Sequence, residues 1–209
     1  MIKINVDFDD VLNQLSIHWE NEHYTRTGEQ LSFTQWDLAE LSKFGNAIYE
    51  YLSEPFFFTD VEVKKDANIL IDFLRNNTSV FSYKIISLCH ETEDSPVFKN
   101  VYSQKREWLI RHFGEDVADK FVLTNKSKKN FPADIVIDDY FKNLIESKRG
   151  CLKLLMDAKH NQNVSVREVQ SKCDGGSVKR VKSHSEIVDI LEQIKFYGSV
   201  ENYMDKSIV

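Results

Sequence analysis

The chain has 209 residues, a length that suits one domain, or one domain that carries an inserted segment. Hydrophobic residues make up 42% of it and aromatic residues 12%, so it can bury a substantial core and disorder is disfavoured. The formal net charge is −6 and no Lys/Arg-rich block dominates, which disfavours a nucleic-acid polymer as a partner. A small phosphate ester is still allowed, because a local cation or a metal can hold it.

The cysteines and the lengths of the apolar runs indicate the cellular compartment in which the protein is expected. Cys89, Cys151 and Cys173 are odd in number and far apart, which is typical of reduced thiols and not of a disulfide framework or a zinc site. The first residues are a charged strand without a signal-peptide core, and no apolar run reaches about 18 residues. We therefore expect a soluble, cytoplasmic protein with no membrane partner.

The first part of the chain predicts a strand followed by helical segments. Residues 2–6 are rich in Ile and Val and predict a strand, and Leu12, Leu15 and Trp19 then recur at helical spacing, so a helix is expected to about Thr25. After a polar break, a helical stretch is expected to about Leu52, before Pro55. Residues 20–58 thus resemble a small helical insertion.

The rest of the chain alternates strands with helices. Helices are expected at 67–74, 99–113 and 185–196, and a polar surface excursion at 164–177. Strands are expected at 79–87, 120–124, 133–139 and 151–157. Strands that alternate with helices imply right-handed crossovers and a mostly parallel sheet.

Polar side chains follow three of these strands at the same edge of the sheet. Asp7 and Asp9 follow the first strand, Ser87 ends the second, and Asp138 and Asp139 end the strand at 133–139. Parallel sheets bind ligands beyond the carboxyl ends of their strands. One acidic cluster alone could be a solvated turn, but two adjacent clusters would repel each other, and a divalent cation such as Mg²⁺ removes that cost.

Asp7 and Asp9 lie on the same face of an extended chain, with Phe8 opposite. One carboxylate could therefore act as a nucleophile while the other serves as general acid and base.

Four motifs in order resemble the haloacid dehalogenase-like phosphatases. "DFDDVLN" resembles motif I, "KIIS" motif II, "TNKSKKN" the segment of the motif III lysine, and "ADIVIDDY" motif IV. The resemblance extends to the 5'(3')-deoxyribonucleotidases of that superfamily through "EPFFFTD", "QKREWLIRHFGED" with "KFVLT", "LLMDAKHNQN" and "RVKSHSEIVDIL". It covers nearly the whole chain.

The resemblance implies a fold and a domain division. The fold is a Rossmann-like three-layer α/β/α arrangement with a mostly parallel sheet and a small helical cap inserted after the first strand. Residues 1–19 and 59–209 would form the phosphatase core, and residues 20–58 the cap.

The resemblance also implies the catalytic and metal-binding residues. Asp7 would be the nucleophile and a metal ligand, and would form an aspartyl-phosphate. Asp9 would protonate the leaving oxygen and then activate water, and its backbone carbonyl would bind Mg²⁺. Asp138 and Asp139 would complete the metal site, with the direct ligand left open between them.

Two further groups would contact the phosphate. Ser87 would hydrogen-bond a phosphate oxygen, and Lys128 would neutralise the phosphate and the aspartyl intermediate. Lys128 lies six residues before Asp134, the spacing expected from the family, with Lys126 and Lys129 as close rivals.

The chain departs from the family pattern at four places. Asp10 replaces the glycine that usually follows the second aspartate, and its side chain could narrow the phosphate entrance or add a water-mediated metal contact. "LCHETEDSP" follows Ser87 where the family commonly has Ser-Pro. The loop before Lys105 is also longer, and Tyr140 stands where an arginine is common; these last two departures leave substrate details open.

The aromatic residues of the cap are more often core than ligand pocket; they are Phe33, Trp36, Phe56, Phe57 and Phe58. Because a base needs a flat apolar surface, the resemblance favours Trp36 and Phe57 as substrate-binding residues. Phe56 and Phe58 are expected to pack inward.

The histidines are expected to be structural or exposed. His90 beside Cys89 lacks a third orienting residue for a nucleophile pair, and neighbouring side chains on an extended chain point apart. His160 could contact the substrate or cap a loop, with the structural role favoured, and His18 and His23 are expected to lie on the surface of the first helix.

The sequence thus predicts a magnesium-dependent 5'(3')-nucleotidase that hydrolyses (deoxy)ribonucleoside monophosphates to nucleoside and phosphate. The predicted partner is the nucleoside monophosphate, and the oligomeric state stays open, a homodimer included. The alternatives are a phosphatase acting on another small phosphate ester and a non-catalytic binding module on this fold. Polynucleotide end-processing is disfavoured by the acidic charge.

Overall fold

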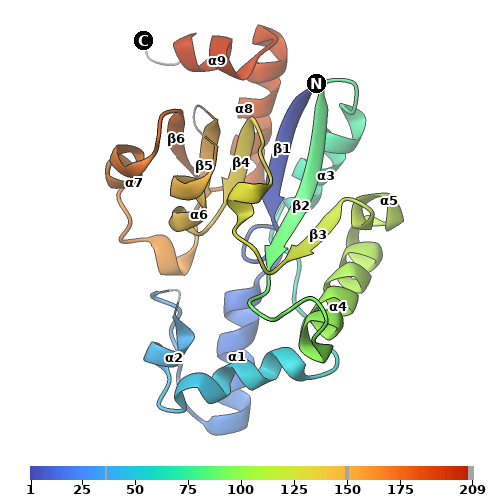
Figure 1. The fold of residues 1–209 in the computed structure, drawn as a ribbon, viewed down its shortest axis with the longest axis vertical. Coiled ribbons are helices and arrows are strands. Elements are labelled where there is room, and N and C mark those ends of the chain that lie inside the picture. Colours follow the sequence, from blue (N-terminus) through green and yellow to red (C-terminus); the bar gives the residue numbers. More distant parts are fainter. Residues whose placement is uncertain (36, 149–150, 207–209) are drawn as a thin grey trace.

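The computed structural model describes residues 1–35, 37–148 and 151–206, and its centre is a six-stranded parallel sheet (Figure 1). The strand order is β3-β2-β1-β4-β5-β6, with every neighbouring pair parallel. The strands are β1 (Ile2–Asp7), β2 (Phe81–Leu88), β3 (Phe121–Thr124), β4 (Ile135–Asp138), β5 (Leu152–Met156) and β6 (Ser177–Val181). This order is that of a Rossmann-like sheet, as the sequence predicted.

Helices cover both faces of the sheet. The α-helices are α1 (Leu15–Thr27), α2 (Leu38–Leu41), α3 (Ala67–Asn76), α4 (Pro96–Phe113), α5 (Glu115–Ala118), α6 (Phe141–Glu146), α7 (Val166–Lys172), α8 (His184–Tyr197) and α9 (Val200–Lys206). The 3₁₀ helices are η1 (Gly45–Ser53), η2 (Lys128–Asn130) and η3 (Lys159–Asn161).

The central strands are apolar on both faces, which is why they lie inside the sheet. In β4, Ile135 and Ile137 join the larger buried cluster, which contains residues of α3, α4 and α8. Val136 points the other way and joins a smaller cluster with Leu144 of α6 and Leu155 of β5. Alternate residues of one strand therefore hold two helical layers in place.

The segment between β1 and α3 lies beyond the carboxyl ends of the strands, below the sheet in Figure 1. An antiparallel bridge between Asn13 and Val63 joins the points where the chain leaves the sheet and returns. The helix expected up to Leu52 is divided into the short α2 and the 3₁₀ helix η1. Helix α1 runs through the boundary predicted at residue 20, and the division into core and cap stays a prediction.

Two other features differ from expectation. Residues 164–177, predicted as a surface excursion, contain α7 and lead into the edge strand β6. His23, predicted on the surface, is buried, with Nδ1 3.0 Å from the Tyr51 hydroxyl and Nε2 2.6 Å from Glu29. His18 is half-buried.

None of the helices in the described ranges combines the length and the apolar character that crossing a bilayer requires. Cys89, Cys151 and Cys173 are free thiols.

Candidate active site

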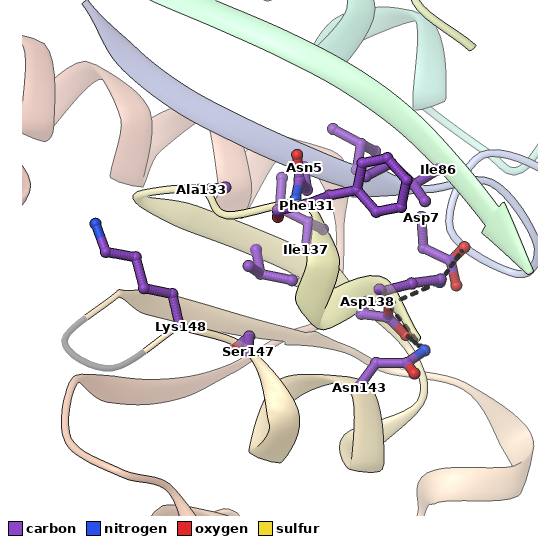
Figure 2. Close-up of a pocket in the computed structure, with 13 residues that line it drawn as sticks. Asn5, Asp7, Ile86, Phe131, Ala133, Ile137, Asp138, Asn143, Ser147 and Lys148 are labelled. Carbon is purple, nitrogen blue, oxygen red and sulfur yellow. Dashed lines mark hydrogen bonds and ion pairs between the residues drawn. The ribbon is translucent and has the colours of Figure 1, made fainter. Parts of the chain in front are cut away.

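The parallel register brings the predicted polar residues to one edge of the sheet. Asp7 ends β1 and Asp138 ends β4, and these two strands are neighbours at the centre of the sheet. Ser87 lies near the end of β2, on the other side of β1, where Asp7 pairs with Ile86. In Figure 2, Asp7 and Asp138 extend from their strand ends into the same pocket, with Asn143 beside Asp138.

Asp7, Asp138 and Asp139 form a buried group of three carboxylates. Each offers one oxygen, and these oxygens lie within 4.8 Å of one another. Burial, and then the charge of Asp138, raise the pKa of Asp7 well above its ordinary value. Burial, followed by the charges of Asp10 and Asp138, does the same to the pKa of Asp139. In both groups burial is the largest cause of the shift, and the negative charges of neighbouring carboxylates add to it.

Lys128 supplies a positive charge to this group. Its Nζ lies 2.7 Å from Asp7 Oδ1 and 2.9 Å from Asp138 Oδ2. Burial alone would lower the pKa of Lys128, but Asp138 and Asp7 raise it above its ordinary value, so the side chain is charged. Of the three candidate lysines, Lys126 and Lys129 are exposed. Of these three lysines, Lys128 is therefore the one whose ammonium group contacts the buried carboxylates.

The two aspartates at the end of β4 have different surroundings. Asp138 accepts hydrogen bonds from the Tyr140 backbone N–H at 2.9 Å and from Asn143 Nδ2 at 3.1 Å, in addition to Lys128. Asp139 has one oxygen 2.9 Å from His160 Nε2, whereas its buried Oδ1 has no N–H or hydroxyl donor in the described part of the chain. Asp139 is therefore the better placed of the two to bind a cation directly.

Asp9 accepts hydrogen bonds at only one of its two carboxylate oxygens among the described residues. Its Oδ2 accepts hydrogen bonds from the Ser87 hydroxyl at 2.9 Å and from Lys105 Nζ at 2.5 Å. Ser87, predicted to contact phosphate, therefore bonds to Asp9 in this structure. The other oxygen, Asp9 Oδ1, is buried without a hydrogen-bond partner among the described residues.

Asp10 occupies a backbone conformation that favours glycine, with φ 53°. Its Oδ1 accepts hydrogen bonds from the Ser16 N–H at 3.0 Å and the Ser16 hydroxyl at 2.8 Å, so the side chain ties down the start of α1. Asp10 also forms a second buried group with Asp139 and His160, whose ligand atoms lie within 4.8 Å of one another. Burial raises the pKa of Asp10.

The cap aromatics divide into buried and exposed residues. Phe57 is only 4% exposed, with ring centroids 5.1 Å from Trp19 and 5.2 Å from His18, so little of its ring is open to a base in this conformation. Phe58 is buried as expected. Phe56 is 69% exposed, so the prediction that it packs inward was wrong; its φ of 71° turns the backbone at that point.

Two aromatic residues of this segment remain, Phe33 and Trp36. Phe33 is buried and its ring lies 6.3 Å from that of His160. Trp36 lies outside the described residues.

Sequence reasoning missed two residues of the site, Lys105 and Asn143. Lys105 could have been found by its spacing, because it follows Val101 by four residues and precedes Trp108 by three on the buried face of α4. A lysine on an apolar helix face needs a buried partner. Asn143 shows no such signal, because its role depends on how α6 meets the end of β4.

Known proteins of similar sequence are nucleotidases. The family model described as "5' nucleotidase, deoxy (Pyrimidine), cytosolic type C protein" matches residues 1–190. A 5'(3')-deoxyribonucleotidase from Clostridium acetobutylicum is 29% identical over 165 residues, which cover 77% of this chain and 84% of that protein.

Solved structures show the same fold. A crystal structure from Burkholderia xenovorans, described as a haloacid dehalogenase-like hydrolase, superposes with a TM-score of 0.53 at 13% identity and covers 90% of this chain and 97% of that one. With the family model matched over residues 1–190, the chain belongs to the deoxy (pyrimidine), cytosolic type C family of 5' nucleotidases, on a haloacid dehalogenase-like fold, and is a phosphoric monoester hydrolase.

Proposed function

We propose that this nucleotidase is a magnesium-dependent 5'(3')-nucleotidase that hydrolyses deoxyribo- and ribonucleoside monophosphates through an aspartyl-phosphate on Asp7. The observation that carries the proposal is the contact of Lys128 with Asp7 at the end of β1, beside Asp138 at the end of β4. A nucleophilic carboxylate beside a fixed cation is suited to attack a phosphate ester, because the cation offsets the repulsion between the two anions.

In the first step, a carboxylate oxygen of Asp7 forms a bond to phosphorus while the bond from phosphorus to the ester oxygen breaks. Asp9 donates a proton to that leaving oxygen, which departs as the nucleoside hydroxyl. In the second step, Asp9 accepts a proton from water as the water oxygen attacks phosphorus. The phosphate leaves and the Asp7 carboxylate is restored. Ser87 and Lys128 hold the phosphate oxygens through both steps.

The residues present fit a divalent cation. Asp7, Asp138 and Asp139 are buried carboxylates in mutual reach, and Asp139 Oδ1, which has no hydrogen-bond partner in residues 1–35, 37–148 and 151–206, lacks a counter-group that a cation would provide. Oxygen donors without sulfur suit Mg²⁺. Asp7 and Asp139 would hold it, with the Asp9 carbonyl as a third ligand, while Asp138 holds Lys128 and Asn143. The bound ion would supply positive charge to the carboxylates and to the phosphate.

The segment 20–58 is proposed to act as the cap that recognises the nucleoside. Its place beyond the strand ends supports this, as does its aromatic composition. Trp36 and Phe57 remain the proposed stacking residues. Because Phe57 is buried in this conformation, stacking on a base would require the loop around it to rearrange. The cytoplasm stays the predicted compartment, and a homodimer stays open.

The proposal is tested by phosphate release from a panel of 5' and 3' nucleoside monophosphates, measured with Mg²⁺ and with a chelator. Release from nucleotides is expected with Mg²⁺ and its loss with the chelator. Folded Asp7→Asn protein should release no phosphate, whereas Lys126→Ala protein should act as the wild type does. Preference for a sugar phosphate or for phosphoglycolate over every nucleotide would favour the alternative, a phosphatase for another small ester.

A further inference from the structure

Lys105 is a buried lysine whose partners belong to the active site. It lies in α4, a helix that begins with the Ser95 cap and Pro96 and ends at Gly114. Its side chain is 3% exposed, and its Nζ lies 2.5 Å from Asp9 Oδ2 and 2.8 Å from Ser87 Oγ. A charged group so far from water needs partners of this kind.

The apolar surroundings of Lys105 fix its position. Its Nζ lies 4.4 Å from the centroid of the Phe58 ring and 5.1 Å from that of Phe8. The neighbouring Gln104 accepts a hydrogen bond from the Phe58 N–H at 2.9 Å and donates one to the Glu54 carbonyl at 2.8 Å. Helix α4 therefore contacts Asp9 through Lys105, and the segment from Glu54 to Phe58 through Gln104, and these contacts restrict the ammonium group.

The contacts of Lys105 close a triangle with Asp9 and Ser87. Lys105 donates to Asp9 Oδ2 and to Ser87 Oγ, and Ser87 donates to the same Asp9 Oδ2. One carboxylate oxygen of Asp9 thus receives two donors, while Oδ1 is buried without a partner among the described residues. The triangle fixes which oxygen of Asp9 is occupied and which is available.

We infer that Lys105 is a positioning residue for Asp9: it holds Oδ2 so that Oδ1 exchanges protons with the leaving oxygen and with water. When the Ser87 hydroxyl turns toward a phosphate oxygen, Asp9 Oδ2 loses that donor, and Lys105 keeps the carboxylate in place. This inference rests on the acid and base role of Asp9 in the proposed function. It predicts that Lys105 matters most for substrates whose leaving oxygen needs a proton.

The test compares two substrates in three variants. Lys105→Met keeps the length of the side chain and removes its charge, Lys105→Arg keeps the charge, and Arg106→Met is the matched control, since Arg106 pairs with Asp119 on the outer face of the same helix. The kcat and KM are measured on a nucleoside monophosphate, whose leaving alkoxide needs protonation, and on p-nitrophenyl phosphate, whose leaving group does not. Inhibition by inorganic phosphate is measured for each variant.

Lys105→Met is expected to lower kcat on the nucleotide by about 100-fold, the lower range for loss of general acid–base catalysis, and on p-nitrophenyl phosphate by about tenfold or less. The KM values and the inhibition by phosphate should change little, Lys105→Arg should recover part of the loss, and Arg106→Met should match the wild type. Equal losses on both substrates together with weaker inhibition by phosphate would make Lys105 a phosphate ligand and overturn the inference.

A double variant separates this inference from the proposed function. If Lys105 acts through Asp9, Asp9→Asn with Lys105→Met should be no slower than Asp9→Asn alone, because the effects of residues acting as a unit do not add. Should Lys105→Met not fold, Lys105→Gln replaces it in the same cycle. If Asp9→Asn lowers kcat equally on both substrates, the proposed acid role of Asp9 fails. If Asp9→Asn lowers kcat more on the nucleotide than on p-nitrophenyl phosphate and Lys105→Met does not, only the role of Lys105 is refuted.

Discussion

The proposed difference between Asp138 and Asp139 as metal ligands can be measured through the stability that Mg²⁺ is expected to confer. When Asp7, Asp138 and Asp139 are all ionised, Lys128 offsets one of their three negative charges, and a divalent cation would neutralise the remaining two. A ligand that binds only the folded state stabilises it by about 2.7 kcal/mol when its concentration is 100 times its Kd. For a chain of this size that corresponds to a rise in Tm of roughly 5–11 °C.

Asp139→Asn should remove most of this rise. The amide oxygen carries no net charge and is a weaker ligand for Mg²⁺ than the carboxylate, so we expect the Mg²⁺-induced shift in Tm to fall by more than half. Because burial raises the pKa of Asp139, the folded protein disfavours its charged form, and the neutral amide relieves that strain. The Tm of the metal-free variant should therefore equal or exceed that of the wild type.

Asp138→Asn should lower the Tm of the metal-free protein and keep the Mg²⁺-induced shift. Asp138 bonds to Lys128 and Asn143, and removal of one partner of a buried ion pair costs about 3–5 kcal/mol. That figure is an upper bound, since Lys128 keeps Asp7. The metal-free Tm should fall, while a Mg²⁺-induced shift remains.

The assay is thermal unfolding of the wild type and both variants, with a chelator and at increasing Mg²⁺. Isothermal titration with Mg²⁺ gives the Kd independently of activity. If Asp138→Asn loses the shift and Asp139→Asn keeps it, the ligand assignment is reversed. If neither variant changes the shift, Mg²⁺ does not bind at this carboxylate group at all.

Three further changes test other parts of the site and the cap. Lys128→Ala should raise KM and lower kcat together, since the lysine faces negative charge in both the ground state and the transition state. Lys126→Ala should be near wild type. A larger loss in Lys126→Ala than in Lys128→Ala would mean that Lys126, and not Lys128, faces the phosphate. His160→Gln should weaken Mg²⁺ binding by roughly 10–100-fold in titration calorimetry, because His160 holds one oxygen of Asp139, and an unchanged Kd would contradict this. The hydrogen bond from His23 lowers the pKa of Glu29 to about 2, so its stabilising effect is present above its ordinary pKa of 4.5 and is lost as the pH falls toward 2. The Tm difference between wild type and Glu29→Gln should accordingly shrink between pH 6 and pH 3, and a constant difference would exclude this role.

The sheet and its active edge could be predicted because both follow from local patterns. Apolar strands that alternate with helices imply parallel pairing, and the ends of parallel strands meet at one edge, so Asp7 and Asp138 were expected to be neighbours. The edge strand β6 was missed because its sequence, "SVKRV", carries two charges and only Val178 and Val181 are buried, which is not the alternation expected of a strand. An edge strand of this kind has the polar character of a surface loop.

The contacts of the cap could not be predicted because they depend on tertiary structure. His23 lies on a helix of mostly polar residues, and only the return of the chain brings Glu29 and Tyr51 to its ring. Phe56 follows Pro55 in an aromatic run that suggests burial, but its positive φ directs the side chain outward. Side-chain direction in such a loop is decided by a single backbone angle, which composition does not reveal.

Buried ionisable side chains of this fold differ in whether the described chain provides a hydrogen-bond partner for them, and this difference distinguishes a structural group from groups of the active site. Lys153 is fully buried, and its Nζ donates a hydrogen bond to the Gly175 carbonyl, so the chain itself supplies a partner for this group. Asp139 Oδ1 and Asp9 Oδ1 are buried with no partner in the described chain. A buried acceptor that binds neither a ligand nor a proton destabilises the folded state by about 1–3 kcal/mol. The position of these two oxygens just after the ends of the neighbouring strands β1 and β4, in a site that also contains Lys128 and Lys105, fits the proposed binding of a metal and a phosphate ester.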